Sequence, residues 1–145
     1  MTAPLFRKIL VANDGSEGAM KALGVGGDLA RRSGAELHAV TVRERVAHHS
    51  LTVVGGEARG SADADDYLRL QGIRAGMVAM DHGVRLKSHL LIGHEVETLV
   101  TFIREHGFDL LVVGFRGHSR GFGDHWGGTS HSLARLAPCA VLVVK

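Results

Sequence analysis

A glycine-rich loop in the last third of the chain carries the residues with the clearest chemical purpose. An apolar run ends at Gly114, and the loop that follows it combines glycines with arginine, serine and histidine. Residues 128–136 then read as a short helix. A strand, a glycine-rich loop and a helix start, in that order, present bare backbone N–H groups to an anion, and arginine adds forked donors for phosphate oxygens. The stretch predicts a phosphate-binding loop, whereas a purely structural turn is the alternative.

Two familiar phosphate-binding motifs are absent from the sequence. Walker A requires a Gly-Lys pair followed by serine or threonine, and the chain contains no Gly-Lys pair. The dinucleotide fingerprint requires Gly-x-Gly-x-x-Gly directly after a strand. Gly24 and Gly26 lie inside a helical stretch, and Gly121 and Gly123 come too far after the strand end. Neither motif explains the loop.

The spacing that is present is Gly-x2-Gly-x9-Gly, at Gly114, Gly117 and Gly127. Together with Lys-Ile-Leu-Val-Ala-Asn-Asp-Gly-Ser at 8–16 and Ala-Pro-Cys at 137–139, this spacing resembles the universal stress protein family over essentially the whole chain. Some members of that family bind ATP and others do not, and the glycine motif is typical of the binding group.

The resemblance implies an α/β fold with an open five-stranded parallel sheet and helices on both faces. This is a Rossmann-like, adenine-nucleotide-binding architecture, and we expect it to form one domain over 1–145. Strands one and four are expected to be central neighbours, so that the loops after Ala12 and Val113 open into one crevice. In open α/β sheets, ligands bind in such crevices at the carboxyl ends of strands.

The resemblance also implies which residues bind the nucleotide. Asp14 aligns with the acid that contacts the nucleoside, although a helix cap at Asp14 or Ser16 is an equally simple interpretation. Val42 falls where main-chain groups face the adenine. The expected ligand is ATP or a related adenine nucleotide, with or without Mg²⁺. The full set of expected nucleotide-binding residues is Ala12, Asn13, Asp14, Val42, Gly114, Arg116, Gly117, His118, Gly127, Gly128, Thr129 and Ser130.

One position departs from the family's ATP-binding pattern. Serine or threonine normally follows the third glycine, and this chain has Gly128 there. Either the loop is shifted by one residue and Thr129 supplies the hydroxyl, or that contact is missing. A lost hydroxyl–phosphate hydrogen bond costs on the order of 1–3 kcal/mol, roughly 10- to 100-fold in affinity. The departure weakens the ATP interpretation without removing it.

Composition excludes several other classes of protein. The chain has 145 residues, 45% of them hydrophobic, and a formal net charge of +2. That charge is too small, and the basic residues are too scattered, to favour a role in binding nucleic acid. No apolar run approaches the roughly 18 residues of a membrane span, and no signal peptide is recognisable. The single cysteine, Cys139, rules out an internal disulfide and reads as a packed core thiol. We expect a cytoplasmic protein.

Strands and helices alternate along the rest of the chain. Residues 43–62 read as a loop, and their His48–His49 pair lacks a third metal ligand, so no metal site is expected. The helix at 93–106 is the most clearly amphipathic, with Glu95 on its solvated face. The expected elements are strands at 8–12, 35–42, 84–92, 108–113 and 140–144, and helices at 17–33, 62–81, 93–106 and a short stretch before 137.

Two functions remain open at this stage. The first is a dimeric stress-response module that binds an adenine nucleotide, and the second is a dimeric interaction module of the same fold that binds none. No nucleophile–base arrangement stands out, and the loop histidines at 118, 125 and 131 read as solvated, so we do not expect an enzyme, slow ATP hydrolysis aside. The apolar last strand, Ala140 to Val144, lies at a sheet edge. Family members pair this strand across a two-fold axis, so a homodimer is expected.

Overall fold

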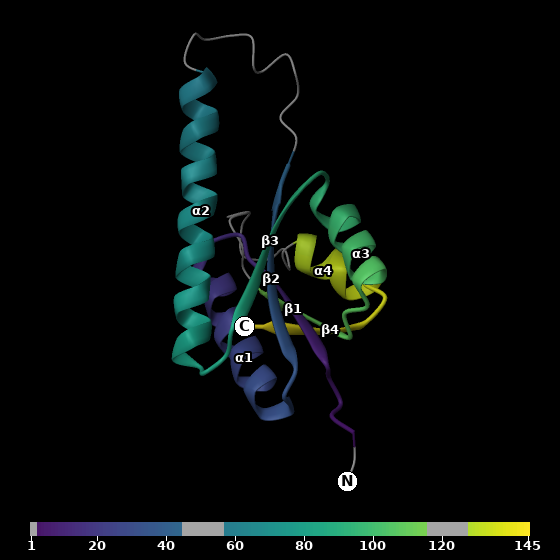
Figure 1. The fold of residues 1–145 in the computed structure, drawn as a ribbon. Helices are drawn as coiled ribbons and strands as arrows, with labels where there is room; N and C mark the ends of the chain where they lie inside the picture. Colours follow the sequence, from purple (N-terminus) through teal and green to yellow (C-terminus); the bar gives the residue numbers. More distant parts are fainter. Residues whose placement is uncertain (1–2, 45–56, 116–127) are drawn as a thin grey trace.

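The parallel sheet lies at the centre of the molecule, with helices packed on both of its faces (Figure 1). This computed structural model describes residues 3–44, 57–115 and 128–145, with the side chains of the second helix described from Asp66. The elements are β1 (Lys8–Ala12), α1 (Glu17–Ser33), β2 (Glu36–Arg43), α2 (Glu57–Asp81), β3 (Leu86–Ile92), α3 (Glu95–His106), β4 (Leu110–Gly114), α4 (Gly128–Leu136) and β5 (Ala140–Val144).

The strand order is β3-β2-β1-β4-β5, and every neighbouring pair is parallel. β1 is therefore the central strand, with Leu10 opposite His38 of β2 on one side and Leu111 of β4 on the other. Because β1 and β4 are covered on both faces, they are continuous apolar runs rather than alternating ones. The expected fold class is confirmed, including the neighbouring positions of strands one and four.

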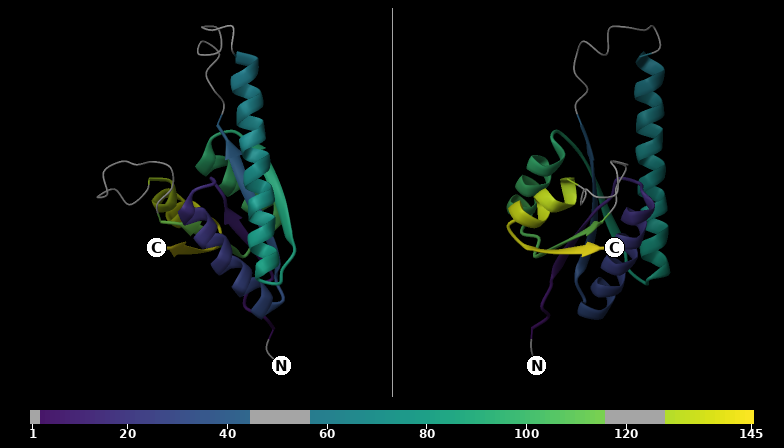
Figure 2. Two further views of the ribbon diagram at one scale, coloured as in Figure 1. Left: turned by 90° about the vertical axis from the view of Figure 1, so that its left-hand side faces the viewer. Right: turned by 180° about the vertical axis from the view of Figure 1, so that it is seen from behind.

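Two hydrophobic cores lie on the two faces of the sheet. α1 and α2 cover one face and α3 and α4 cover the other, as the views from the side and from behind show (Figure 2). Alternate residues of β1 point into different cores, with Ile9 and Val11 on the α1 side and Leu10 on the α3 side. The sheet is thus sandwiched in the three-layer arrangement that a βαβ pattern predicts.

The glycines of α1 let this helix lie close to the sheet, as the sequence suggested. A Cβ placed on Gly26 would lie 2.8 Å from Cγ2 of Val11, so only glycine allows this spacing. The helix begins at the N-cap Ser16 and ends at Gly34, whose φ of 70° is the left-handed conformation that glycine adopts without strain. The close contact holds the middle of α1 against the central strand.

The helix α2 begins earlier than expected. The sequence assigned residues 43–62 to a loop, but the helix starts at Glu57. The segment Glu57-Ala-Arg-Gly-Ser-Ala contains good helix formers, and the single Gly60 costs only about 1 kcal/mol, which a long helix tolerates. His48 and His49 lie outside the described residues. In the part of the chain that the structure describes, no helix combines the length and apolarity that crossing a bilayer requires.

Candidate functional site

The turn after β1 forms one wall of a crevice at the carboxyl edge of the sheet. Asn13 Oδ1 accepts a hydrogen bond from Gly15 N–H (3.0 Å), and Asp14 Oδ1 accepts one from Ser16 N–H (2.9 Å). Ser16 Oγ in turn accepts from Ala19 N–H (3.1 Å), so Ser16 is the N-cap of α1 and Asp14 stabilises the turn before it. This settles which of the two residues caps the helix.

Gly15 is needed at this turn for two reasons. Its φ of 81° lies in the left-handed region, where other residues are strained. A Cβ there would also lie 2.7 Å from the Tyr67 hydroxyl and 2.8 Å from Cδ of Gln71, both on α2. The second helix therefore packs directly over the turn that follows β1. Gln71 Oε1 is buried there and has no hydrogen-bond partner among the described residues.

β2 continues past the end of β1 and exposes its backbone to the crevice. The last residues paired between the two strands are Ala12 and Val40, and the carbonyl of Val40 accepts a hydrogen bond from Asn13 N–H (2.8 Å). Backbone groups of alternate residues in a strand point to the same neighbour. Val42 therefore directs its N–H and C=O toward the β1 side, where no described strand residue pairs with them.

β4 and α4 form the opposite wall. The first turn of α1 touches the end of β4, because a Cβ on Gly114 would lie 2.7 Å from the backbone carbon of Gly18. Ser130, which is buried, donates a hydrogen bond from Oγ to the carbonyl of Gly114 (2.7 Å). This bond fixes the start of α4 beside the end of β4. The turn 13–16 and two later residues, Gly114 and Ser130, thus meet across the first turn of α1.

Glu95 is the residue of this crevice that sequence reasoning missed. It was assigned to the solvated face of its helix, but in the structure it is half-buried and accepts a hydrogen bond from Thr129 at the start of α4. Burial raises the pKa of Glu95, and the nearby carboxylates of Asp14 and Glu44 raise it further. The assignment was wrong because helical periodicity cannot show that the N-terminal turn of α3 faces another helix. Nothing in the sequence around Glu95 signalled this contact.

Part of the expected site is outside the described residues. Arg116, Gly117, His118 and Gly127 fall in the segment 116–127, as do Ser119 and His125. Among the described members of the expected set, the structure brings together the residues after β1, Val42 at the end of β2, Gly114, and the start of α4 with Gly128, Thr129 and Ser130.

Two cavities adjoin the crevice. One, of about 420 Å³, lies between α2 and the sheet and runs from Asn13 past Thr41 to Leu90, with Leu68 and Gly72 of α2 on its other side. The second, of about 690 Å³, lies between α3 and α4 and includes Glu95 and Thr129. Both volumes are in the range of small-molecule sites. The crevice therefore has an apolar compartment on the α2 side and a mixed compartment with three glutamates, Glu44, Glu95 and Glu97, on the α3 side.

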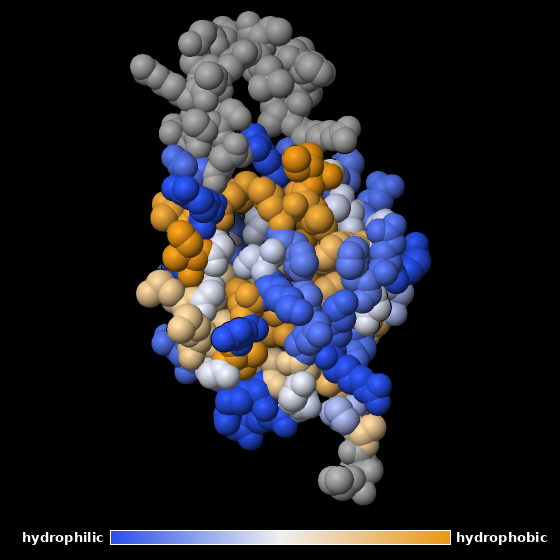
Figure 3. Space-filling view, in the orientation of Figure 1, coloured by the Kyte–Doolittle hydropathy of each residue, from blue (hydrophilic) through white to orange (hydrophobic). Residues whose placement is uncertain are grey.

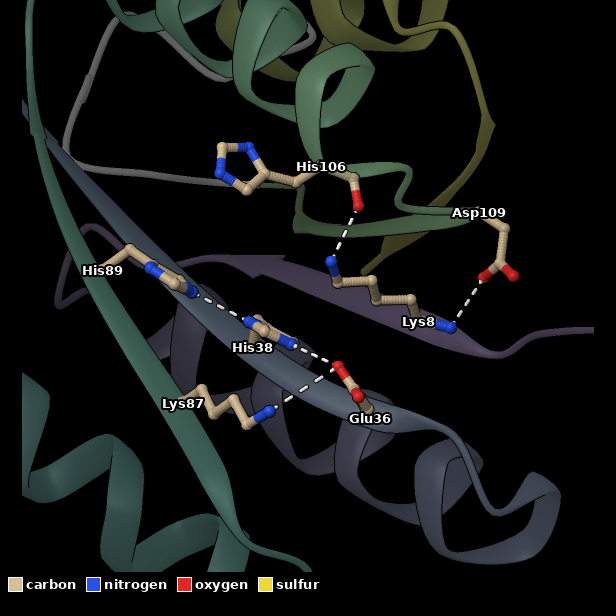
Figure 4. A network of polar contacts seen from close by, with 7 residues as sticks. All are labelled: Lys8, Glu36, His38, Lys87, His89, His106 and Asp109. Atoms are coloured by element: carbon tan, nitrogen blue, oxygen red, sulfur yellow. Dashed lines mark hydrogen bonds and ion pairs between the residues drawn. The ribbon is translucent and has the colours of Figure 1, made fainter.

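A second polar cluster lies on the α3 face of the sheet, away from the crevice (Figure 4). His38 Nε2 is 3.0 Å from Glu36 Oε2, and His38 Nδ1 is 2.8 Å from His89 Nε2. Because a carboxylate only accepts, His38 carries its proton on Nε2 and accepts from His89 N–H at Nδ1. Burial lowers the pKa of both histidines. The pair packs edge-on against Phe108 and Phe102.

The cluster works as a polar element of the core rather than as a metal centre. His38 is only 5% exposed, and the neighbouring charges of Lys8 and Lys87 disfavour any further positive charge there. Within the described ranges, no three His, Cys, Asp or Glu side chains are arranged to hold a metal ion. Burial also raises the pKa of the Cys139 thiol, which agrees with a packed thiol of low reactivity.

Comparison with known proteins identifies the family. The sequence model of the Universal stress protein family matches residues 5–145. The chain is 32% identical to the Universal stress protein YxiE of Bacillus subtilis, over 97% of this chain and 100% of that protein. It is 30% identical to a Universal stress protein of Thermus aquaticus, with 97% and 100% covered.

A solved structure gives the same result. The universal stress protein UspA from Lactobacillus plantarum superposes with a TM-score of 0.78 at 27% identity, over 97% of this chain and 98% of that one. Sequence and fold therefore agree over nearly the whole chain. The chain belongs to the universal stress protein family.

Proposed function

We propose that this chain binds an adenine nucleotide in the crevice between β1 and β4 and acts as a dimeric regulatory module, not as an enzyme, in the cytoplasm. The observation that carries the proposal is that the turn 13–16 lies at the same edge of the sheet as Gly114 and the start of α4, about 100 residues later in the sequence. Structures of the same fold support it: one is a universal stress protein in complex with cAMP, and another is from Archaeoglobus fulgidus in complex with dAMP.

The base fits the α2 side of the crevice. Val42 offers one N–H donor and one C=O acceptor past the end of β1, which match the acceptor and donor on the Watson–Crick edge of adenine. The adjoining cavity is lined largely by apolar atoms of Ala39, Leu68 and Ile73, so a flat aromatic ring is desolvated there at little cost. In this proposal, the carboxylate of Asp14 accepts hydrogen bonds from the ribose hydroxyls.

The phosphates face the start of α4. Helix α4 begins at Gly128, and its first backbone N–H groups have no intrahelical partner. With the positive end of the helix dipole, they make a favourable environment for an anion. Ala12 and Asn13 line the opposite side, and Arg116, Gly117, His118 and Gly127 complete the proposed contacts from the segment outside the described residues. ATP, with or without Mg²⁺, is the proposed ligand.

The hydroxyl groups favour a second candidate function. The Ser130 hydroxyl already donates a hydrogen bond to the Gly114 carbonyl, and the Thr129 side chain already donates one to Glu95. Gly128 has no side chain, so no hydroxyl of this segment is left over for a phosphate without rearrangement. Glu95 also adds negative charge beside the proposed phosphate position. These contacts support the alternative, a dimeric interaction module of the same fold that binds no nucleotide.

Calorimetric titration with ATP, AMP and cAMP, each with and without Mg²⁺, separates the two functions. Binding by the wild type, and its loss in Gly117→Val and Asp14→Ala, supports the nucleotide site. The matched control is Asp81→Ala, which removes a carboxylate from the exposed end of α2 and should leave binding unchanged. No heat with any of the three nucleotides up to about 1 mM, the weak end of useful affinities, would leave only the interaction module.

The proposed dimer forms through β5. This strand lies at the end of the sheet, and pairing it with a second copy would satisfy its free edge. Leu142 is the central residue of Ala140–Val144, so an antiparallel two-fold pairing places it beside its own copy. Leu142→Glu then puts two carboxylates together and should break this contact, which lowers the oligomer mass measured by light scattering. An unchanged mass would argue against β5 as the interface.

A further inference from the structure

Helix α2 exposes a stripe of large apolar side chains at the end of the sheet remote from β5. We name it the α2 stripe and define it as Leu70, Ile73, Met77 and Met80, which are between 56% and 73% exposed. In Figure 3 apolar surface is visible on the side of the molecule formed by α2, and a second apolar patch lies over the upper part of β3. Monomeric proteins rarely leave such a continuous surface uncovered, so the stripe indicates an interface.

The stripe is not the face by which α2 packs on its own sheet. Ala75 and Ala79, which are fully buried, and the half-buried Val78 face the core and the helix α1. The spacing of the stripe is 3-4-3, which is the a/d spacing of helices that pack in pairs. One helix therefore carries two apolar faces, and only one of them is covered by the described residues.

We infer that the α2 stripe binds the α2 stripe of a second copy of this chain, with the two helices antiparallel. The four positions are symmetric about Ala75. A two-fold axis there places Leu70 opposite Met80 of the other copy, and Ile73 opposite Met77. This pairing of unlike heptad positions in each layer is what an antiparallel helix pair requires, and an isologous contact requires a self-complementary surface.

The charges beside the stripe agree with this partner. Arg74 and Asp81 lie on the same flank, seven residues apart. In the antiparallel pair, the two copies of Arg74 lie near the axis, and each lies about 7.5 Å along the helix from Asp81 of the other copy. An extended arginine reaches this distance, so each arginine can turn toward the opposite aspartate. On the other flank, Gly76 has open space around it, which leaves room for Arg69 of the second copy.

This contact is independent of nucleotide binding and is separate from β5, because β3 and α2 lie at one end of the sheet and β5 at the other. Disulfide trapping tests it directly. In a Cys139→Ser background, Ile73→Cys with Met77→Cys places the two thiols opposite each other across the axis. Mild oxidation should give a covalent dimer in most of the protein. The matched control, Thr101→Cys with Arg104→Cys on the exposed face of α3, should give only collisional traces.

Light scattering supplies the second readout. With the β5 edge charged by Leu142→Glu, the chain should still dimerise through the stripe. Adding Ile73→Glu and Met77→Glu should weaken that association by roughly 100-fold or more, since like charges are brought together. Adding Leu5→Glu and Leu136→Glu, two exposed leucines elsewhere, should leave it intact.

Three results would overturn the inference. The first is trapping no stronger than in the α3 control. The second is an oligomer that persists when Ile73→Glu and Met77→Glu are added to Leu142→Glu. The third is protein that co-sediments with phosphatidylcholine vesicles while no disulfide forms, which would mean that lipid covers the α2 stripe. Circular dichroism of each variant verifies the fold, and all substituted positions on α2 are exposed, so unfolding is not expected.

Discussion

Gly114→Ala is predicted to destabilise the fold substantially, although it adds only one methyl group. The new Cβ would lie 2.7 Å from the carbonyl carbon and 2.8 Å from the carbonyl oxygen of Gly18, and 3.2 Å from Ala19 N. All three are backbone atoms of the first turn of α1, which cannot rotate away as a side chain can. The helix must instead shift away from β4, which also loosens the turn that forms one wall of the crevice.

The size of the effect can be estimated from the cost of overpacking a protein core. Adding one carbon to a well-packed site without room costs about 1–3 kcal/mol. For a chain of this size, each kcal/mol lowers Tm by about 3 °C, so the expected decrease is roughly 3–9 °C. The control is Gly76→Ala in α2, where an added Cβ meets nothing within 4 Å. That change should stabilise the helix by about 0.5–1 kcal/mol.

Urea unfolding followed by circular dichroism measures both variants, with calorimetry for Tm. The reasoning would be refuted by equal stabilities of Gly114→Ala and wild type, or by a gain in the former. Such a result would mean that the first glycine of the motif is not required by its contact with α1. The contact makes glycine favourable for stability at this position whether or not a nucleotide binds.

Three further predictions follow from the same structure. Ser130→Ala should cost about 1–3 kcal/mol in urea unfolding, because the part-buried hydrogen bond to the Gly114 carbonyl is lost; no loss would mean that another donor replaces it. Leu111→Ala should cost about 2–5 kcal/mol, since this side chain is fully buried at the centre of the sheet, and a cost under 1 kcal/mol would contradict the packing described. Stability should fall as the pH drops below about 6.5, where unfolded histidine takes up a proton while burial lowers the pKa of His38 and His89 in the fold. His38→Gln with His89→Gln should flatten that part of the pH profile, and an equally steep profile would place the acid sensitivity elsewhere.

Sequence reasoning succeeded where local pattern decides the structure. The apolar runs predicted the central strands, and the Asn-Asp-Gly-Ser segment predicted a turn leading into a capped helix. The neighbouring positions of β1 and β4 came from the resemblance rather than from the pattern. The start of α2 was placed five residues late, because Gly60 and small residues weaken the helical signal without breaking the helix.

The contacts that join distant elements could not be predicted. Glu95 has the sequence context of a solvated residue, and only the packing of α3 against α4 brings it to Thr129. The pairing of His38 with His89 depends on the register between β2 and β3. The α2 stripe was hidden for a related reason, since the sequence does not show which of the two apolar faces of this helix packs on the sheet. The structure shows that Ala75 and Ala79 pack toward the sheet, and that the α2 stripe is therefore left exposed.

Extraction of bound nucleotide tests the central claim most directly. The protein is purified without added nucleotide, denatured gently, and the released small molecules are identified and quantified by mass spectrometry. The account predicts an adenine nucleotide in near-stoichiometric amount, and its loss in Gly117→Val purified in the same way. Wild-type protein that releases none, and that also fails to bind ATP added at about 1 mM in the presence of Mg²⁺, would contradict the nucleotide site.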